Sequence, residues 1–148
     1  MPSYASSVEA QTYFDGRLNT DAWDSASAGD KTKALAQATA IIDRLNFVGT
    51  RTDTDQVNQF PRGTDVTIPQ DIKDASAEIA LALLDGVNPE LEYENINMTS
   101  QGYGGIRSSF DRSVKPPHIV AGVPSFIAWT LLAPYLRDPS NIELHRTN

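Results

Sequence analysis

Two stretches of this chain carry apolar residues at the spacing of an α-helix, and they limit the possible folds more than any other feature. From Ala34 to Leu45 the apolar positions follow an i, i+3, i+4, i+7 pattern, and from Ile72 to Leu84 a wider stripe does the same. A helix with one apolar face must bury that face against another element. The sequence therefore predicts a mainly α-helical protein, a small four-helix bundle that includes these two helices.

Capping signals predict where the helices begin and end. A serine followed three residues later by an acidic residue is typical of a helix N-terminus, and proline is favoured in the first turn, where its missing N–H costs nothing. These signals predict helices that begin at Ser6, Ser27, Pro69 and Pro124. Glycine is expected to stop the first three, and Pro134 should end or kink the last because it removes a backbone donor.

The connection over residues 50–68 is polar and contains the sequence FPR. We expect Phe60 to anchor this loop onto the core and Pro61 to stiffen the corner. Arg62 would then be held where its planar guanidinium can pair with a carboxylate, in the same subunit or in the next one. A corner that serves only its own subunit is the alternative interpretation.

A second long connection, over about residues 88–122, holds the sequence GYGG between flanks of strand-like residues. Glycine can adopt positive φ, so this pattern predicts an extended, β-hairpin-like arm between the last two helices. A long ordered excursion from a small domain typically contacts a partner.

The length of 148 residues fits a single domain covering residues 1–148. Its helical core is expected at about 4–86 and 123–137, and residues 138–148 form an extended C-terminal tail with too few apolar residues to pack alone. The N-terminal residues lack the basic and apolar regions of a secretory signal. The most apolar stretch, residues 123–136, is too short for a membrane span, so we expect no membrane association.

Residues capable of catalysis or metal binding are scarce. Cysteine is absent, and His118 and His145, the two imidazoles, lie far apart in the sequence. Asp21 and Asp24 flank Trp23 before a helix start, where local capping and a core anchor are the simplest roles. We therefore expect no enzyme activity, no metal and no cofactor.

The charge balance argues against a simple nucleic-acid binder. The formal net charge is −7, with 12 basic residues scattered among 19 acidic ones, whereas nucleic-acid binders cluster Lys and Arg to displace phosphate counterions. Tyr103 and Phe110 could stack on the bases of single-stranded DNA. Only Arg107, Arg112 and Lys115 lie near them in the sequence.

The order of these segments resembles the bacteriophage head-to-tail connector family, also called adaptor or head-completion proteins. The resemblance is carried by YASSVEAQTYFDGRL, AWDSASAGDKTKALAQATAIIDRL, FPRGTDVTIPQDIKDASAEIALALL and VPSFIAWTLLAPYL, from Tyr4 to Leu136. It implies a structural virion protein at the head–tail interface, made in the host cytoplasm. Typically twelve copies would form a ring under the portal protein, extend the DNA channel used in genome ejection, and dock a tail or nozzle protein.

The same resemblance implies roles for the two irregular segments. The tail would bind the portal, and the arm would contact neighbouring subunits or tail proteins, while DNA passes through the channel without specific binding. The implied tail residues are Asn141, Ile142, Glu143, Leu144, His145 and Arg146, and the implied arm residues are Tyr103, Ile106, Arg107, Phe110 and Arg112.

Similar sequences are also described as DnaT-like single-stranded-DNA-binding proteins. The alternative function is therefore a single-stranded-DNA-binding accessory protein of phage replication. The acidic composition argues against this alternative, because an acidic surface tends to repel DNA.

Overall fold

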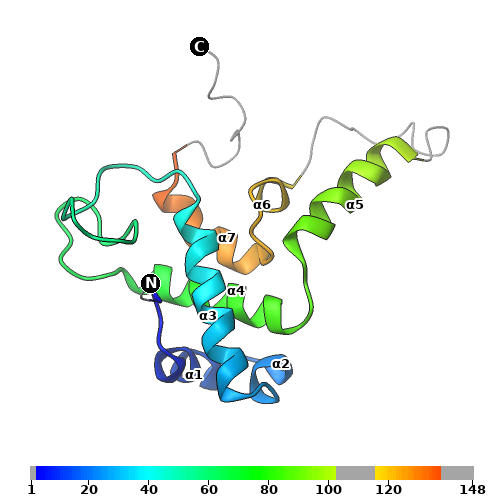
Figure 1. The fold of residues 1–148 in the computed structure, drawn as a ribbon, viewed down its shortest axis with the longest axis horizontal. Coiled ribbons are helices and arrows are strands. Elements are labelled where there is room, and N and C mark those ends of the chain that lie inside the picture. Colours follow the sequence, from blue (N-terminus) through cyan, green and yellow to red (C-terminus); the bar gives the residue numbers. More distant parts are fainter. Residues whose placement is uncertain (1–2, 103–115, 138–148) are drawn as a thin grey trace, which may run out of the picture.

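The computed structural model describes residues 3–102 and 116–137, and this part of the chain is mainly α-helical, as the apolar patterns predict (Figure 1). No strand is present in these residues; two isolated β-bridges join loops. The elements are α1 (Ser7–Asp15), α2 (Asp21–Asp24), α3 (Ala28–Asp43), α4 (Gln70–Leu84), α5 (Pro89–Gly102), α6 (Pro117–Val120), α7 (Phe126–Leu132) and the 3₁₀-helix η2 (Ala133–Tyr135).

Helix α4 lies at the centre of the bundle. Every residue from Ala75 to Leu81 is buried, so the helix is covered on all sides. Helices α3 and α7 make the most extensive contacts with it, α1 and α2 add smaller ones, and Figure 1 shows α3 crossing α4. The two helices predicted from the long apolar stripes therefore form the middle of the core.

Serine caps confirm two of the predicted helix starts. At α1 the Ser6 hydroxyl accepts from the Glu9 N–H at 3.1 Å, while the Glu9 carboxylate accepts from the Ser6 N–H at 3.0 Å. At α3 the Ser27 hydroxyl accepts from the Asp30 N–H at 3.1 Å. Side-chain oxygens thus satisfy N–H groups that have no partner within the helix.

The starts predicted from proline are one or two residues early. Pro69 is the extended N-cap of α4, with ψ 144°, and the helix begins at Gln70. At α7 the Ser125 hydroxyl accepts from the Ala128 N–H at 3.1 Å, so the cap falls after Pro124. The expected effect of Pro134 is confirmed, because α7 ends at Leu132 and a 3₁₀ turn follows.

The predicted β-hairpin-like arm is wrong in its first part, where residues 89–102 form helix α5. The Asn88 side chain accepts from the Glu90 N–H at 3.0 Å and from the Leu91 N–H at 3.4 Å, which starts the helix. Pro89 fits its first turn, and Glu90 and Glu92 there complement the helix dipole. These signals for a helix N-terminus outweigh the strand propensity of the residues that follow.

Trp23 anchors the N-terminal part of the core, as predicted. Its side chain is fully buried in α2, its ring lies 4.9 Å from that of Phe14, and its indole N–H donates to Gln11 at 2.9 Å. Asp21 and Asp24 are the ends of this four-residue helix, which the sequence patterns did not predict. None of the described helices combines the length and apolar character that a membrane-spanning helix needs.

Candidate nucleic-acid interface

The turn after α3 joins two segments that are distant in the sequence. An antiparallel bridge pairs Phe47 with Leu136, and a second pairs Arg51 with Arg62. The Arg137 N–H donates to the Asn46 carbonyl at 3.0 Å. These contacts bring Arg51, Arg62 and Arg137 together, and we call these three residues the arginine cluster.

Buried aromatic rings fix the position of the loop that carries the cluster. Phe60 is 4% exposed, and its ring lies 4.6 Å from that of Phe47 and 5.8 Å from that of Tyr135. The Phe60 N–H donates to the Tyr4 hydroxyl at 3.1 Å, and that hydroxyl donates in turn to the Asp43 carboxylate. The Phe60–Pro61 peptide bond is cis. Arg62 therefore lies two residues after a side chain that is held in the core.

Arg62 donates to neutral oxygens instead of the predicted carboxylate of its own subunit. Its Nε donates to the Val48 carbonyl at 3.0 Å and its Nη1 to Gln59 Oε1 at 2.6 Å, while Nη2 donates to the Gly49 carbonyl. Gly49 adopts a φ of 79°, a conformation that glycine tolerates, so the turn can present its carbonyls to the guanidinium. Pairing with a carboxylate of the same subunit is therefore not observed, because carbonyl and amide oxygens occupy the donors. Pairing with a carboxylate of a second subunit stays a prediction.

No carboxylate of the described residues forms a direct ion pair with the cluster. Within residues 3–102 and 116–137, ion pairs join only Arg17 to Glu78 and Lys73 to Glu9. Burial lowers the pKa of Arg62, and the charges of Arg137 and Arg51 lower it further.

Two guanidinium groups beside a third positive charge suit an anion with several acceptor oxygens, such as a phosphate. Arg51 and Arg137 are exposed, so a ligand can reach them, while Arg62 is half-buried. Asp53, Asp55 and Asp65 are exposed on the same loop and will limit the attraction of more distant anions. The geometry fits contact with individual phosphates better than long-range attraction.

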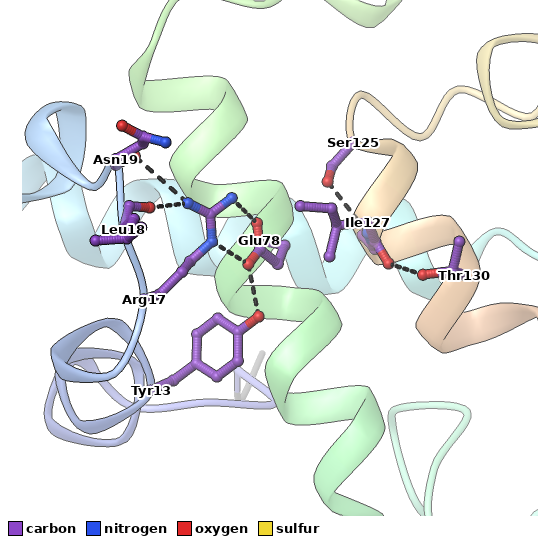
Figure 2. A network of polar contacts seen from close by, with 9 residues as sticks. Tyr13, Arg17, Leu18, Asn19, Glu78, Ser125, Ile127 and Thr130 are labelled. Atoms are coloured by element: carbon purple, nitrogen blue, oxygen red, sulfur yellow. Dashed lines mark hydrogen bonds and ion pairs between the residues drawn. The ribbon is translucent and has the colours of Figure 1, made fainter.

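A second polar cluster surrounds Glu78, which is 2% exposed (Figure 2). The Arg17 Nε and Nη2 donate to its two oxygens at 2.6 and 2.9 Å, and the Tyr13 hydroxyl donates at 2.6 Å. Burial and the neighbouring carboxylate raise the pKa of Tyr13. Because both oxygens have close donors, the carboxylate ties α1 and the turn after it to α4 and is not free to act as a base.

The described residues also offer few candidates for a metal site or a catalytic histidine. They contain no group of three or more His, Asp or Glu side chains that could hold a metal ion. His118 lies against Phe126, with ring centroids 5.7 Å apart, and burial lowers its pKa. The remaining histidine, His145, lies outside these residues.

Most of the site residues expected from the sequence also lie outside the described part of the chain. This applies to Tyr103, Ile106, Arg107, Phe110, Arg112 and Lys115 of the arm and to Asn141, Ile142, Glu143, Leu144, His145 and Arg146 of the tail. The loop corner of Phe60, Pro61 and Arg62 is described, and it forms part of the arginine cluster.

Arg51 and Arg137 were not predicted as site residues. They belong to segments far apart in the sequence, and neither lies in a recognisable motif. One signal was present: each arginine of the cluster follows an aromatic residue of the core by two to four positions, Arg51 after Phe47, Arg62 after Phe60 and Arg137 after Tyr135.

A family model described as "Putative DnaT-like ssDNA binding protein" matches residues 1–146. No curated protein and no solved structure matches the chain. The family match overturns the resemblance to head-to-tail connectors. The ring under the portal, the tail or nozzle partner, the passive DNA channel and the virion location rested on that resemblance, and they are withdrawn with it.

The resemblance was misleading for a physical reason. The segments that carried it contain capping serines, amphipathic stripes and prolines at helix ends, and any small helical bundle uses these features. Their order along the chain describes a bundle, but it does not identify the partner that the bundle binds.

Proposed function

Because the chain belongs to the family described as putative DnaT-like ssDNA-binding proteins, we propose that it binds single-stranded DNA as an accessory protein of DNA replication. The match over residues 1–146 carries this proposal. The proposed role is binding alone, without catalysis, metal or cofactor.

The arginine cluster is the proposed binding site for the phosphates of the DNA backbone. The exposed guanidinium groups of Arg51 and Arg137 can donate hydrogen bonds to phosphate oxygens, and such contacts do not depend on the base sequence. Arg62 adds its positive charge beside them, and its side chain is already held by five carbonyl or amide acceptors, so little side-chain freedom is lost when a phosphate binds there.

The experiment is a fluorescence-anisotropy titration of labelled oligo(dT) with the full chain and with Arg51→Gln/Arg137→Gln. This double variant removes two exposed charges and leaves the hydrogen bonds of Arg62 to the turn in place. For single strands the slope of log K against log salt is about −0.7 for each phosphate neutralised, so we expect the slope to weaken by about 1.4. The affinity at low salt should fall with it.

The matched control is Lys31→Gln/Lys33→Gln, which removes the same charge from the first half of α3, away from the turn. It should bind oligo(dT) nearly as well as the original protein. Absence of binding by the original protein at low salt would refute the proposed function. Equal losses in the two double variants would refute the assignment to the arginine cluster.

A further inference from the structure

A groove of about 520 Å³ lies where the C-terminal end of α3 meets α5 and α6. Figure 1 shows α5 leading away from the bundle on the side of α6. Gln37 and Arg44 line the groove from α3, and Asn88, Glu90 and Tyr93 line it from α5 and the residue before it. Apolar side chains complete the lining: Ile41, Leu83, Pro89, Ile119 and Val120.

The chemistry of this lining suits a flat, polar-edged ring. Tyr93 lines the groove and is 43% exposed, so a ligand can reach its aromatic side chain. The Gln37 amide is exposed. The Asn88 carbonyl oxygen caps α5, which leaves its NH₂ group to donate. A nucleobase presents the complementary features, an aromatic face and an edge of donors and acceptors.

The charges around the groove favour a base inside it and a phosphate at its end. Glu90 lines the groove and disfavours an anion within it. Arg44 is exposed at the end of α3 and forms no ion pair within the described residues. A guanidinium in that position can hold a phosphate next to the base.

One groove residue, Arg44, lies close in the chain to the turn that holds the arginine cluster. Arg44 is two residues before Asn46, whose carbonyl accepts from the Arg137 N–H at 3.0 Å. Two consecutive peptide units span at most about 7.6 Å, so Arg44 is close to the backbone that holds the cluster. A strand bound along the cluster can therefore continue into the groove.

We propose that this groove is a nucleobase subsite, in which an unpaired base stacks on Tyr93 while Arg44 holds the neighbouring phosphate. The inference rests on the proposed function and deepens it. A paired base must leave its duplex before it can enter, and that unpairing costs free energy. The groove thus supplies a reason for a preference for single strands, which phosphate contacts alone do not supply.

The test compares oligo(dT) with an abasic deoxyribose-phosphate oligomer of the same length and label. Both carry the same backbone charge, so both can bind the arginine cluster, but only oligo(dT) can fill the groove. We expect oligo(dT) to bind about tenfold more tightly. Tyr93→Ala should remove this preference and leave the affinity for the abasic oligomer unchanged, whereas Tyr93→Phe should retain it.

Leu91→Ala is the matched control, because Leu91 is a similarly exposed apolar residue of α5, at 52%, that does not line the groove. It should keep the preference, and circular dichroism should show equal helicity in all variants. Equal binding of the two oligomers by the original protein, or a preference that persists in Tyr93→Ala, would overturn the subsite and leave the proposed function standing. Failure to bind either oligomer would overturn both.

Discussion

At the scale of single residues, Glu78 shows how a buried charge is accommodated. Its carboxylate is 2% exposed and receives two hydrogen bonds from Arg17 and one from Tyr13. Burial of a charge is costly, and close donors offset that cost. The cluster therefore sets the position of α1 on α4.

We expect Glu78→Gln to lower the free energy of unfolding by about 3 kcal/mol, because it leaves the Arg17 guanidinium without its ion-pair partner beside the core. Urea unfolding followed by circular dichroism measures this loss. Glu9→Gln is the control: Glu9 pairs with Lys73 in an exposed bridge at 2.7 Å, and the loss should stay below about 1 kcal/mol. Similar losses in the two variants would contradict a special role for the buried carboxylate.

At the scale of elements, the loop between α3 and α4 depends on the core for its conformation. It forms no helix or strand over residues 50–68, yet Phe60 is buried and the loop backbone pairs with itself. The Thr52 N–H donates to the Pro61 carbonyl at 3.0 Å, and the Gly63 N–H donates to the Thr50 carbonyl at 2.8 Å. The buried Phe60 and these backbone hydrogen bonds therefore hold a loop that carries two residues of the arginine cluster.

Phe60→Ala should destabilise the protein by about 3 kcal/mol through loss of core packing. The amides of Thr52 and Gly63 should also exchange with solvent much faster, which hydrogen-exchange mass spectrometry or NMR can measure. Val57→Ala on the same loop is the control, because Val57 is 65% exposed and its truncation removes little packing. Unchanged protection of these amides in Phe60→Ala would show that the loop is held by other contacts.

At the scale of the whole molecule, net charge was a poor guide to the partner. The value of −7 led to the expectation that DNA would not bind, and the family match overturned it. Charges are screened over about 8 Å at physiological salt, so a bound phosphate responds mainly to its neighbours and much less to the sum over the chain. Three arginines brought together by folding can therefore bind an anion on an acidic protein.

Two tyrosines, the buried Tyr4 and the partly buried Tyr13, tie the N-terminal segment to the rest of the molecule. They also make the stability of the protein fall at alkaline pH. Burial and hydrogen bonds to carboxylates raise the pKa of Tyr4 and of Tyr13 above 10. The unfolded chain then loses these protons first as pH rises, so the folded state binds more protons and its stability falls above about pH 10. Below that pH the contribution of both groups is fully present.

Urea unfolding across the alkaline range should show this decline, and Tyr4→Phe/Tyr13→Phe should make the pH dependence shallower. The two proteins differ only at these two tyrosines, so the difference between the two profiles isolates their contribution. Parallel profiles would contradict the assignment.

The sequence by itself determined the helical class, the central pair of helices and the serine caps. Each of these depends on residues within a turn or two of one another, through hydrogen bonds such as that from Glu9 to Ser6 or through one apolar face. The first part of the connection after α4 was predicted as a hairpin, although the Asn88 cap and Pro89 were local signals for a helix.

Only the tertiary structure decided which charges meet. Arg51, Arg62 and Arg137 come from three segments, and they converge because Phe47, Phe60 and Tyr135 pack together beneath them. The groove beside Tyr93 likewise depends on how α3, α5 and α6 are placed. Local sequence patterns report the conformation of one segment, whereas a binding surface depends on the packing of several segments against one another.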